Sequence, residues 1–163
     1  MNRSLRRRAE AGLFNGVLRT VAALARSPVR SLVAPFLAAV APVVRAYRGV
    51  RPAPLDAKSL GERWQDLMPS KKGVPITGVE GDTAYGEIRM PCPLRGTGDV
   101  HACHRLMAYD RALMRPDGAR FVVLESQAEA GVERCRIAIR PAHLDAQDLV
   151  DAHVRVEALT AGR

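Results

Sequence analysis

Basic charge is confined to the first third of this 163-residue chain. Residues 1–53 contain ten arginines, no lysine and one acidic residue, Glu10. Residues 54–163 contain fifteen basic and sixteen acidic residues, so the net charge of +8 belongs wholly to the first segment. We therefore expect a basic N-terminal arm (residues 1–53) followed by one small, nearly neutral domain (residues 54–163), whose own ligand the overall charge does not indicate.

The arm has the pattern of an amphipathic helix. Its apolar residues recur every third or fourth position, while most arginines fall elsewhere. Ser27 and Pro28 end this first helix, and Pro28 opens a second one. The residues of the apolar stripe are Leu5, Ala9, Leu13, Val17, Val21 and Leu24.

The second arm segment contains an apolar run, Leu32 to Val44, interrupted by Pro35 and Pro42. This run is shorter than the roughly twenty residues that a spanning helix needs. Arginine beside apolar residues suits an anionic membrane surface, contacted through residues 1–50. Packing on the domain or on a second copy, in a homo-oligomer, is an equal alternative. A signal peptide is disfavoured because Arg19 interrupts the apolar stretch, and a specific nucleic-acid tail is disfavoured by the regular stripe.

The rest of the chain predicts an α+β domain. Two strand candidates (residues 74–81 and 83–90) precede a helix over 100–114, and two more strands (120–127 and 133–140) follow around a turn of about four residues. A short helix with Leu60, Trp64 and Leu67 inward precedes them, and residues 144–159 form a closing helix. The order β-β-α-β-β predicts an antiparallel sheet covered by helices on one face.

Three cysteines and one aspartate form the candidate site. Cys92 follows a predicted strand, and Cys103 lies two helical turns before Asp110, so these two share nearly the same helix face. Cys135 alternates with Ile137 and Ile139 on one side of a strand. We expect the three thiols and Asp110 to meet where sheet, loop and helix join. The alternative is that each cysteine is an ordinary buried residue.

These residue types favour nucleophilic chemistry. A thiolate at Cys92 or Cys135 would attack, and Asp110 would carry a proton. Arg105 or Arg134 would hold a substrate carboxylate. An odd number of cysteines without a disulfide framework favours a reducing, cytoplasmic compartment, with peripheral membrane attachment through the arm.

A zinc site is the alternative use of the same cysteines. Cys92, Cys103 and Cys135 with His101 or His104 would supply four ligands. Their spacings are not those of a zinc finger or ribbon, and the sequence has no Cys-x-x-Cys. We therefore expect no metal cofactor.

The segment from "MPCPL" through "MAYDRALMRPDG" to "LESQAEAGVERCRIAIRP" resembles the L-2-amino-thiazoline-4-carboxylic acid hydrolase-like family over residues 74–141. The elements that carry the resemblance are Cys92-Pro93, Asp110, and Gly131 through Cys135. Ile137 stands where the family usually has an aromatic residue, and Met107 stands where members carry a cysteine. The resemblance implies opening of a cyclic C–N bond in a small sulfur heterocycle.

Two functions follow as expectations. The first is hydrolysis of a C–N bond in a small cyclic carboxylate substrate, with Cys92, Cys103, Asp110 and Cys135 at the site. The second is a non-enzymatic module that binds a ligand or metal and is attached to a membrane or partner through the arm.

Overall fold

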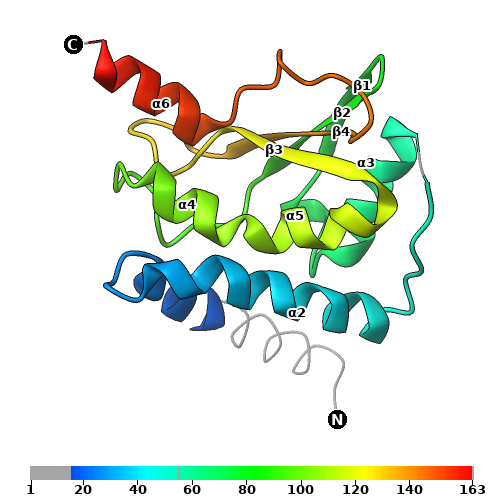
Figure 1. The fold of residues 1–163 in the computed structure, drawn as a ribbon, viewed down its shortest axis with the longest axis horizontal. Coiled ribbons are helices and arrows are strands. Elements are labelled where there is room, and N and C mark those ends of the chain that lie inside the picture. The colour runs from blue at the N-terminus through cyan, green and yellow to red at the C-terminus, as the bar shows by residue number, and fades with distance from the viewer. Residues whose placement is uncertain (1–15, 55, 163) are drawn as a thin grey trace.

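The computed structural model describes residues 16–54 and 56–162 and shows a four-stranded antiparallel sheet with helices packed on one face (Figure 1). The sheet has the order β1-β2-β4-β3. The predicted α+β class, with an N-terminal helix before the sheet, is confirmed. The strands are β1 (Ile76–Glu80), β2 (Thr83–Ile88), β3 (Ala119–Glu125) and β4 (Cys135–Pro141).

Figure 1 labels five helices, of which α2, α3, α4 and α5 lie on one side of the sheet and α6 lies at one end of it. A further helix, whose described part is Gly16–Ala25, precedes them and is called the N-terminal helix below. Short 3-10 turns occupy Arg30–Leu32 (η1), Lys71–Gly73 (η2) and Arg115–Asp117 (η3). The labelled helices are α2 (Val33–Tyr47), α3 (Ala57–Leu67), α4 (Val100–Leu106), α5 (Ala108–Met114) and α6 (Ala152–Ala161).

The inner face of the sheet builds the main core because side chains alternate along each strand. Cys135, Ile137 and Ile139 of β4 are all buried in this core, as the alternation predicted. The ring of Phe121 in β3 packs against the ring of Trp64 in α3, with 5.6 Å between the ring centroids. The sheet therefore holds Cys135 on the side where the helices lie.

Helix α3 packs with the predicted residues facing inward, and its start is capped by Asp56. The side chain of Asp56 accepts a hydrogen bond of 2.7 Å from the backbone N–H of Ser59, a typical N-cap that satisfies one free donor of the first turn. Leu60, Trp64 and Leu67 face inward and are fully buried. This register brings the Trp64 indole to α5, where it bonds Asp110.

Three predicted elements differ in detail. The helix over 100–114 is divided at Met107 into α4 and α5. Strands β3 and β4 are joined by residues 126–134 rather than a four-residue turn, because Gln127 turns inward to bond the end of β2. The last helix starts only at Ala152, because Leu149 before it is buried on the outer face of the sheet.

The described part of the arm packs against the domain. Helix α2 lies along α5, and Ala41 is buried in the main core (Figure 1). Arg45 of α2 forms a buried ion pair with Asp117, with nitrogen–oxygen distances of 2.7 and 3.0 Å. The N-terminal helix is linked to α4 by a hydrogen bond, which Arg105 donates to the carbonyl oxygen of Ala25.

The apolar run of the arm forms a longer helical stretch than its thirteen residues suggested. Arg30–Tyr47 is 18 residues long with a mean hydropathy of 1.2, and by length and composition it is long enough to cross a membrane. Core helices of soluble proteins and signal sequences meet the same criterion. In this structure Arg45 of this stretch is buried in an ion pair with Asp117, so one side of the stretch packs against the domain.

Candidate active site in a cavity beneath the arm

The three cysteines and Asp110 line one cavity of about 130 Å³. Each comes from a different part of the fold. Cys92 follows β2, Cys103 lies in α4, Asp110 lies in α5 and Cys135 begins β4. Their convergence, predicted from the sequence, is a property of the structure, whereas their catalytic role remains a prediction.

The walls of the cavity are almost entirely apolar, and the arm supplies part of them. Val17, Leu18 and Val21 come from the N-terminal helix and Leu37 from α2. None of the described lining residues is an arginine, lysine or histidine. The remaining lining residues are Trp64, Met68, Val74, Ile88, Met90, Pro91, Leu106, Met107, Tyr109 and Gln127.

The pKa of the Cys135 thiol lies below its usual range. The thiol of Cys103 donates a hydrogen bond to its sulfur, which lowers the pKa of Cys135 despite burial. The backbone N–H of Gln127 also donates to this sulfur, at 3.3 Å. The same bond from Cys103 raises the pKa of Cys103, with burial as the second cause, so Cys103 stays protonated as the donor. The pKa of the Cys92 thiol is raised, mainly by burial.

Gln127 fixes the segment that carries Cys92. It is fully buried, and its amide nitrogen donates to the carbonyl oxygens of Ile88 (3.0 Å) and Met90 (3.1 Å). Its amide oxygen accepts from the backbone N–H of Cys92 at 3.3 Å and from the guanidinium of Arg95. Gln127 therefore contacts two of the cysteines. Its side-chain amide bonds the backbone of Cys92, and its backbone N–H bonds the sulfur of Cys135.

Asp110 lies in the cavity wall with an indole as its hydrogen-bond partner. The Nε1–H of Trp64 donates to Oδ1 of Asp110 at 2.9 Å, and both side chains are buried. Burial raises the pKa of Asp110 to about 6, although the bond from Trp64 and the charge of Arg111 act in the opposite direction. A carboxyl group with a pKa near neutrality both donates and accepts protons at physiological pH.

The two arginines predicted to hold a substrate carboxylate do not line the cavity. Arg105 donates to the carbonyl of Ala25 at 3.0 Å and thereby anchors the N-terminal helix. Arg134 is half-exposed and pairs with Glu87 at 3.3 Å, on the outer side of β2. Their predicted role in substrate binding therefore has no support at this cavity.

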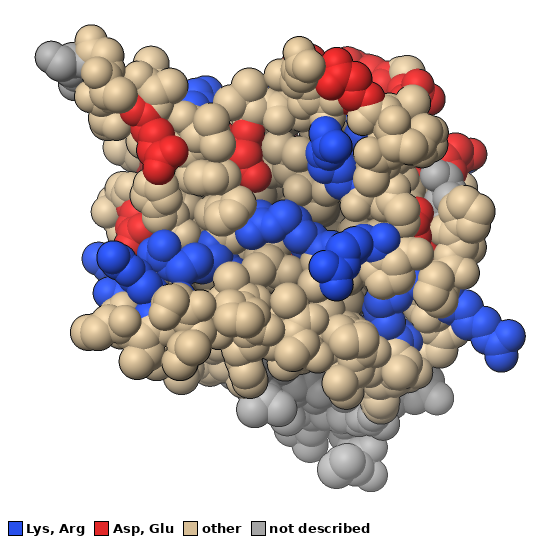
Figure 2. All heavy atoms as spheres, viewed as in Figure 1, with Lys and Arg blue, Asp and Glu red and all other residues tan. Residues whose placement is uncertain are grey.

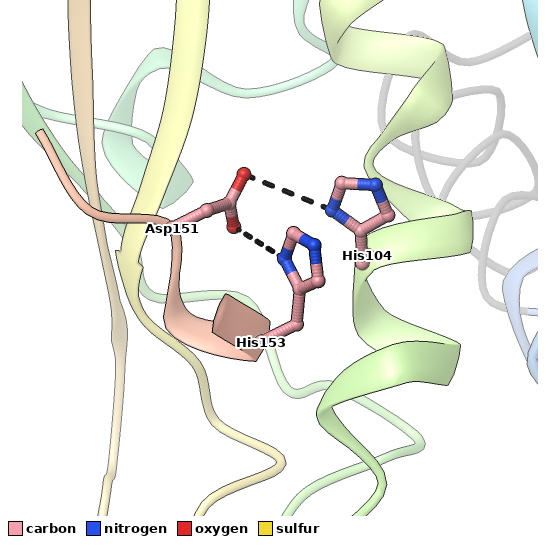
Figure 3. A group of neighbouring side chains, drawn as sticks. All are labelled: His104, Asp151 and His153. Carbon is pink, nitrogen blue, oxygen red and sulfur yellow. Dashed lines mark ion pairs between the residues drawn. The ribbon is translucent and has the colours of Figure 1, made fainter. Parts of the chain in front are cut away.

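The histidines that were considered as zinc ligands with the cysteines also point away from the cavity. His101 Nε2 lies 3.3 Å from Oε1 of Glu157 in α6. His104 faces Asp151 and His153, and these three form the group in the described part of the chain whose geometry suits a metal ion (Figure 3). The three cysteines do not form such a group there.

Two residues of the site were not identified from the sequence. Trp64 was expected only as a core residue, and Gln127 was not singled out. The signal for Trp64 was available, because a buried indole N–H needs an acceptor and a buried aspartate needs a donor. Gln127 gave no comparable signal, since it lies in a segment that has the pattern of a strand end.

Comparisons with known proteins do not place the chain in a family. No family model, no curated protein and no solved structure matches it.

Proposed function

We propose that the cavity binds a small, neutral ring compound and that Cys135 and Asp110 hydrolyse a carbon–nitrogen bond in it. The observation that carries this proposal is the convergence of three thiols and one carboxyl group, from four segments of the chain, on one apolar cavity. Free cysteines are often buried singly in cores, but here they share a cavity with an acid that has no arginine or lysine hydrogen-bonded to it in the described residues.

The size of the cavity favours a single ring. A cavity of about 150 Å³ lined by aliphatic and aromatic side chains holds one benzene molecule. At about 130 Å³, this cavity suits a five- or six-membered ring with few substituents. This agrees with the small heterocycle that the sequence resemblance implies.

The polarity of the cavity favours a neutral molecule. A buried carboxylate is costly unless it is paired, and the described lining residues include no cation to pair with it. We therefore propose a neutral substrate in place of the carboxylate-bearing one expected from the sequence. Its ring nitrogen would lie beside Asp110, the carboxyl group in the wall.

The proposed reaction has two halves, formation and hydrolysis of a covalent intermediate, and Cys135 and Asp110 act in both. The sulfur of Cys135 adds to the carbonyl carbon of a cyclic amide, and Asp110 gives its proton to the ring nitrogen as the C–N bond breaks, which leaves a thioester on Cys135 and a free amine. Asp110 then takes a proton from water, whose oxygen displaces the sulfur and releases the acid product. Cys103, which donates to Cys135, would stabilise the thiolate before and after the reaction.

The test is binding and turnover of three small rings, 2-piperidinone, 2-pyrrolidinone and benzene, followed by NMR. We expect all three to bind and at least one of the first two to be hydrolysed. Cys135→Ser and Asp110→Asn should abolish turnover and keep binding, while Val21→Phe, which fills the cavity, should abolish both. Arg136→Ser is the matched control, because Arg136 precedes Ile137 on β4 but points to the exposed face.

The outcomes distinguish the two candidate functions. Binding without turnover of any ring, with Cys135 still protected from alkylation by the bound ring, would leave a ligand-binding module. Failure of all three rings to bind, or equal turnover by Cys135→Ser, would show that the cavity is not the site proposed here.

A second candidate, attachment to an anionic membrane surface, has support from one face of α2. Leu32, Phe36, Val43 and Tyr47 are spaced by four, seven and four residues and therefore lie on the same side of the helix. Phe36 is 60% exposed and Val43 67% exposed. Figure 2 shows lysine and arginine side chains in a band along the junction of α2 with α4 and α5, beside the uncharged surface of α2. Apolar residues bordered by cations suit anionic lipid.

A further inference from the structure

Three side chains from two helices meet on the far side of α4 from the cavity. His104 lies in α4, Asp151 is the N-cap residue of α6, and His153 follows in its first turn (Figure 3). Their nitrogen and oxygen atoms all lie within 4.8 Å of one another. All three are partly buried, so the group is shielded but reachable from solvent.

The two imidazoles face the same carboxylate. Nδ1 of His153 lies 3.3 Å from Oδ1 of Asp151, and Nδ1 of His104 lies 3.7 Å from Oδ2. The ring centroids of the two histidines are only 3.8 Å apart. Burial raises the pKa of Asp151, but the facing imidazoles of His104 and His153 outweigh it, so the pKa of Asp151 lies below its usual range. Asp151 is therefore an anion facing two ring nitrogens.

The histidine nitrogens that face the carboxylate lack hydrogen bonds. Among the described residues, Nδ1 of His104 and Nδ1 of His153 are both buried without a partner of good geometry. Buried polar atoms without partners are rare in folded proteins, and an ion bound between such atoms satisfies them. Two such nitrogens on neighbouring rings, each facing one oxygen of the same carboxylate, point to a common ligand among the three side chains (Figure 3).

We propose that His104, Asp151 and His153 form a binding site for a divalent transition-metal ion, with zinc as the preferred ion. Two imidazoles and one carboxylate are the ligand set of open zinc sites, which keep the remaining position for water. A zinc ion bound by these three residues would join α4 to α6. The site is separate from the cavity, since none of its three ligands lines it.

The charges around the site favour a cation. Glu157 of α6, paired with His101 of α4, adds a second carboxylate next to the group. Arg111 of α5 is the opposing cation, and burial lowers its pKa although Asp151 acts to raise it. Two carboxylates against one guanidinium leave the surroundings with one net negative charge, which favours a bound cation.

The rival explanation is a hydrogen-bonded histidine pair without metal. In that case one imidazolium would share its proton with Asp151, and the stacked rings would need no ion. Cysteine is the other competitor, because Cys103 precedes His104 and thiolates bind zinc well. The test must therefore separate nitrogen and oxygen ligands from sulfur.

Cobalt(II) and zinc titrations of the reduced, full-length protein make this separation. Cobalt bound by nitrogen and oxygen gives no sulfur-to-metal charge-transfer band, whereas thiolate ligation does. We expect one cobalt per chain, without that band, displaced by zinc. The variant in which Cys92, Cys103 and Cys135 are all serine should bind with unchanged affinity.

Ligand variants complete the test. His104→Ala and His153→Ala should each weaken zinc binding by at least roughly 100-fold, since loss of even an outer partner of a ligand costs about 10- to 100-fold. His143→Ala is the control, because His143 is exposed and outside the group. Thermal unfolding without metal confirms that each variant folds. A charge-transfer band from sulfur, binding by His104→Ala equal to the unmodified protein, or no binding of either metal would each overturn the proposal.

Discussion

The surroundings of Asp110 raise the pKa of its carboxyl group. The sequence places an acid on an apolar helix face, and the structure gives it a buried position with one neutral donor, Trp64. Because that donor is uncharged, burial dominates and the pKa rises to about 6. The position of Asp110 was predictable from helix spacing. Its partner Trp64 was not identified, although the needs of a buried indole and a buried carboxyl group suggest such a pair, because α3 and α5 meet only through tertiary packing.

The raised pKa of Asp110 predicts a pH dependence of stability. The folded state binds this proton more tightly than the unfolded chain, so the stabilisation is complete below about pH 4 and is lost as the pH rises through about 6. Asp110→Asn keeps an oxygen acceptor for Trp64 and cannot ionise. Between pH 4 and pH 8, the unmodified protein should lose up to about 3 kcal/mol more stability than this variant, measured by urea unfolding.

Asp148→Asn provides a control with the opposite sign. The pKa of Asp148 is lowered by hydrogen bonds from Arg140, so its contribution to stability appears as the pH rises. Removing it should make the variant relatively less stable at high pH. Parallel pH curves for Asp110→Asn and the unmodified protein would contradict the assignment of a raised pKa to Asp110.

At the scale of elements, the strands and α3 were predicted well because their signals are local. Alternation placed Cys135 with Ile137 and Ile139, and the spacing of Leu60, Trp64 and Leu67 gave the inward face of α3. The link between β3 and β4 was mispredicted because a tertiary contact of Gln127 shapes it. The relation of α4 to α6 was equally hidden, since His104 and His153 belong to segments far apart in the sequence.

The docking of α2 depends on one buried ion pair. Arg45 and Asp117 side chains are 5% and 0% exposed. Arg45→Met should cost about 3–5 kcal/mol in unfolding free energy, because it leaves Asp117 as a buried charge. Arg63, 3.5 Å from Asp117, places the cost at the lower end of that range.

Arg136→Met is the matched control for this pair. Arg136 pairs with Glu125 at 3.2 Å where both side chains are exposed, so its loss should cost less than about 1 kcal/mol. Urea unfolding of the two variants compares them directly. Equal costs would show that the pair between α2 and η3 does not hold the arm on the domain.

At the scale of the whole molecule, the arm has two sides with different surroundings. The inner side packs on α5 and lines the cavity, and the outer side of α2 carries exposed apolar residues. Packing and lipid contact were equal alternatives from the sequence. Packing of the arm on the domain is observed for the described residues, and lipid contact stays a prediction. Residues 1–15, where Leu5, Ala9 and Leu13 of the predicted stripe fall, lie outside the described residues.

Lipid contact predicts that the protein co-sediments with vesicles containing anionic phosphatidylglycerol. Phe36→Glu combined with Val43→Glu should weaken binding at least about 100-fold, since burying two large apolar side chains contributes roughly 3 kcal/mol. Val79→Glu is the control, because Val79 is also exposed but lies on β1. Unchanged sedimentation of the double variant, or equal binding to uncharged phosphatidylcholine, would refute an anionic surface as the partner.

The N-terminal helix contributes Val17, Leu18 and Val21 to the wall of the cavity. A partner that draws this helix outward would enlarge or open the compartment, and a guest molecule inside would hold the helix in place. The two events are then thermodynamically linked, and each must change the affinity of the other by the same factor. Occupancy of the cavity would then change how readily the N-terminal helix moves away from the domain.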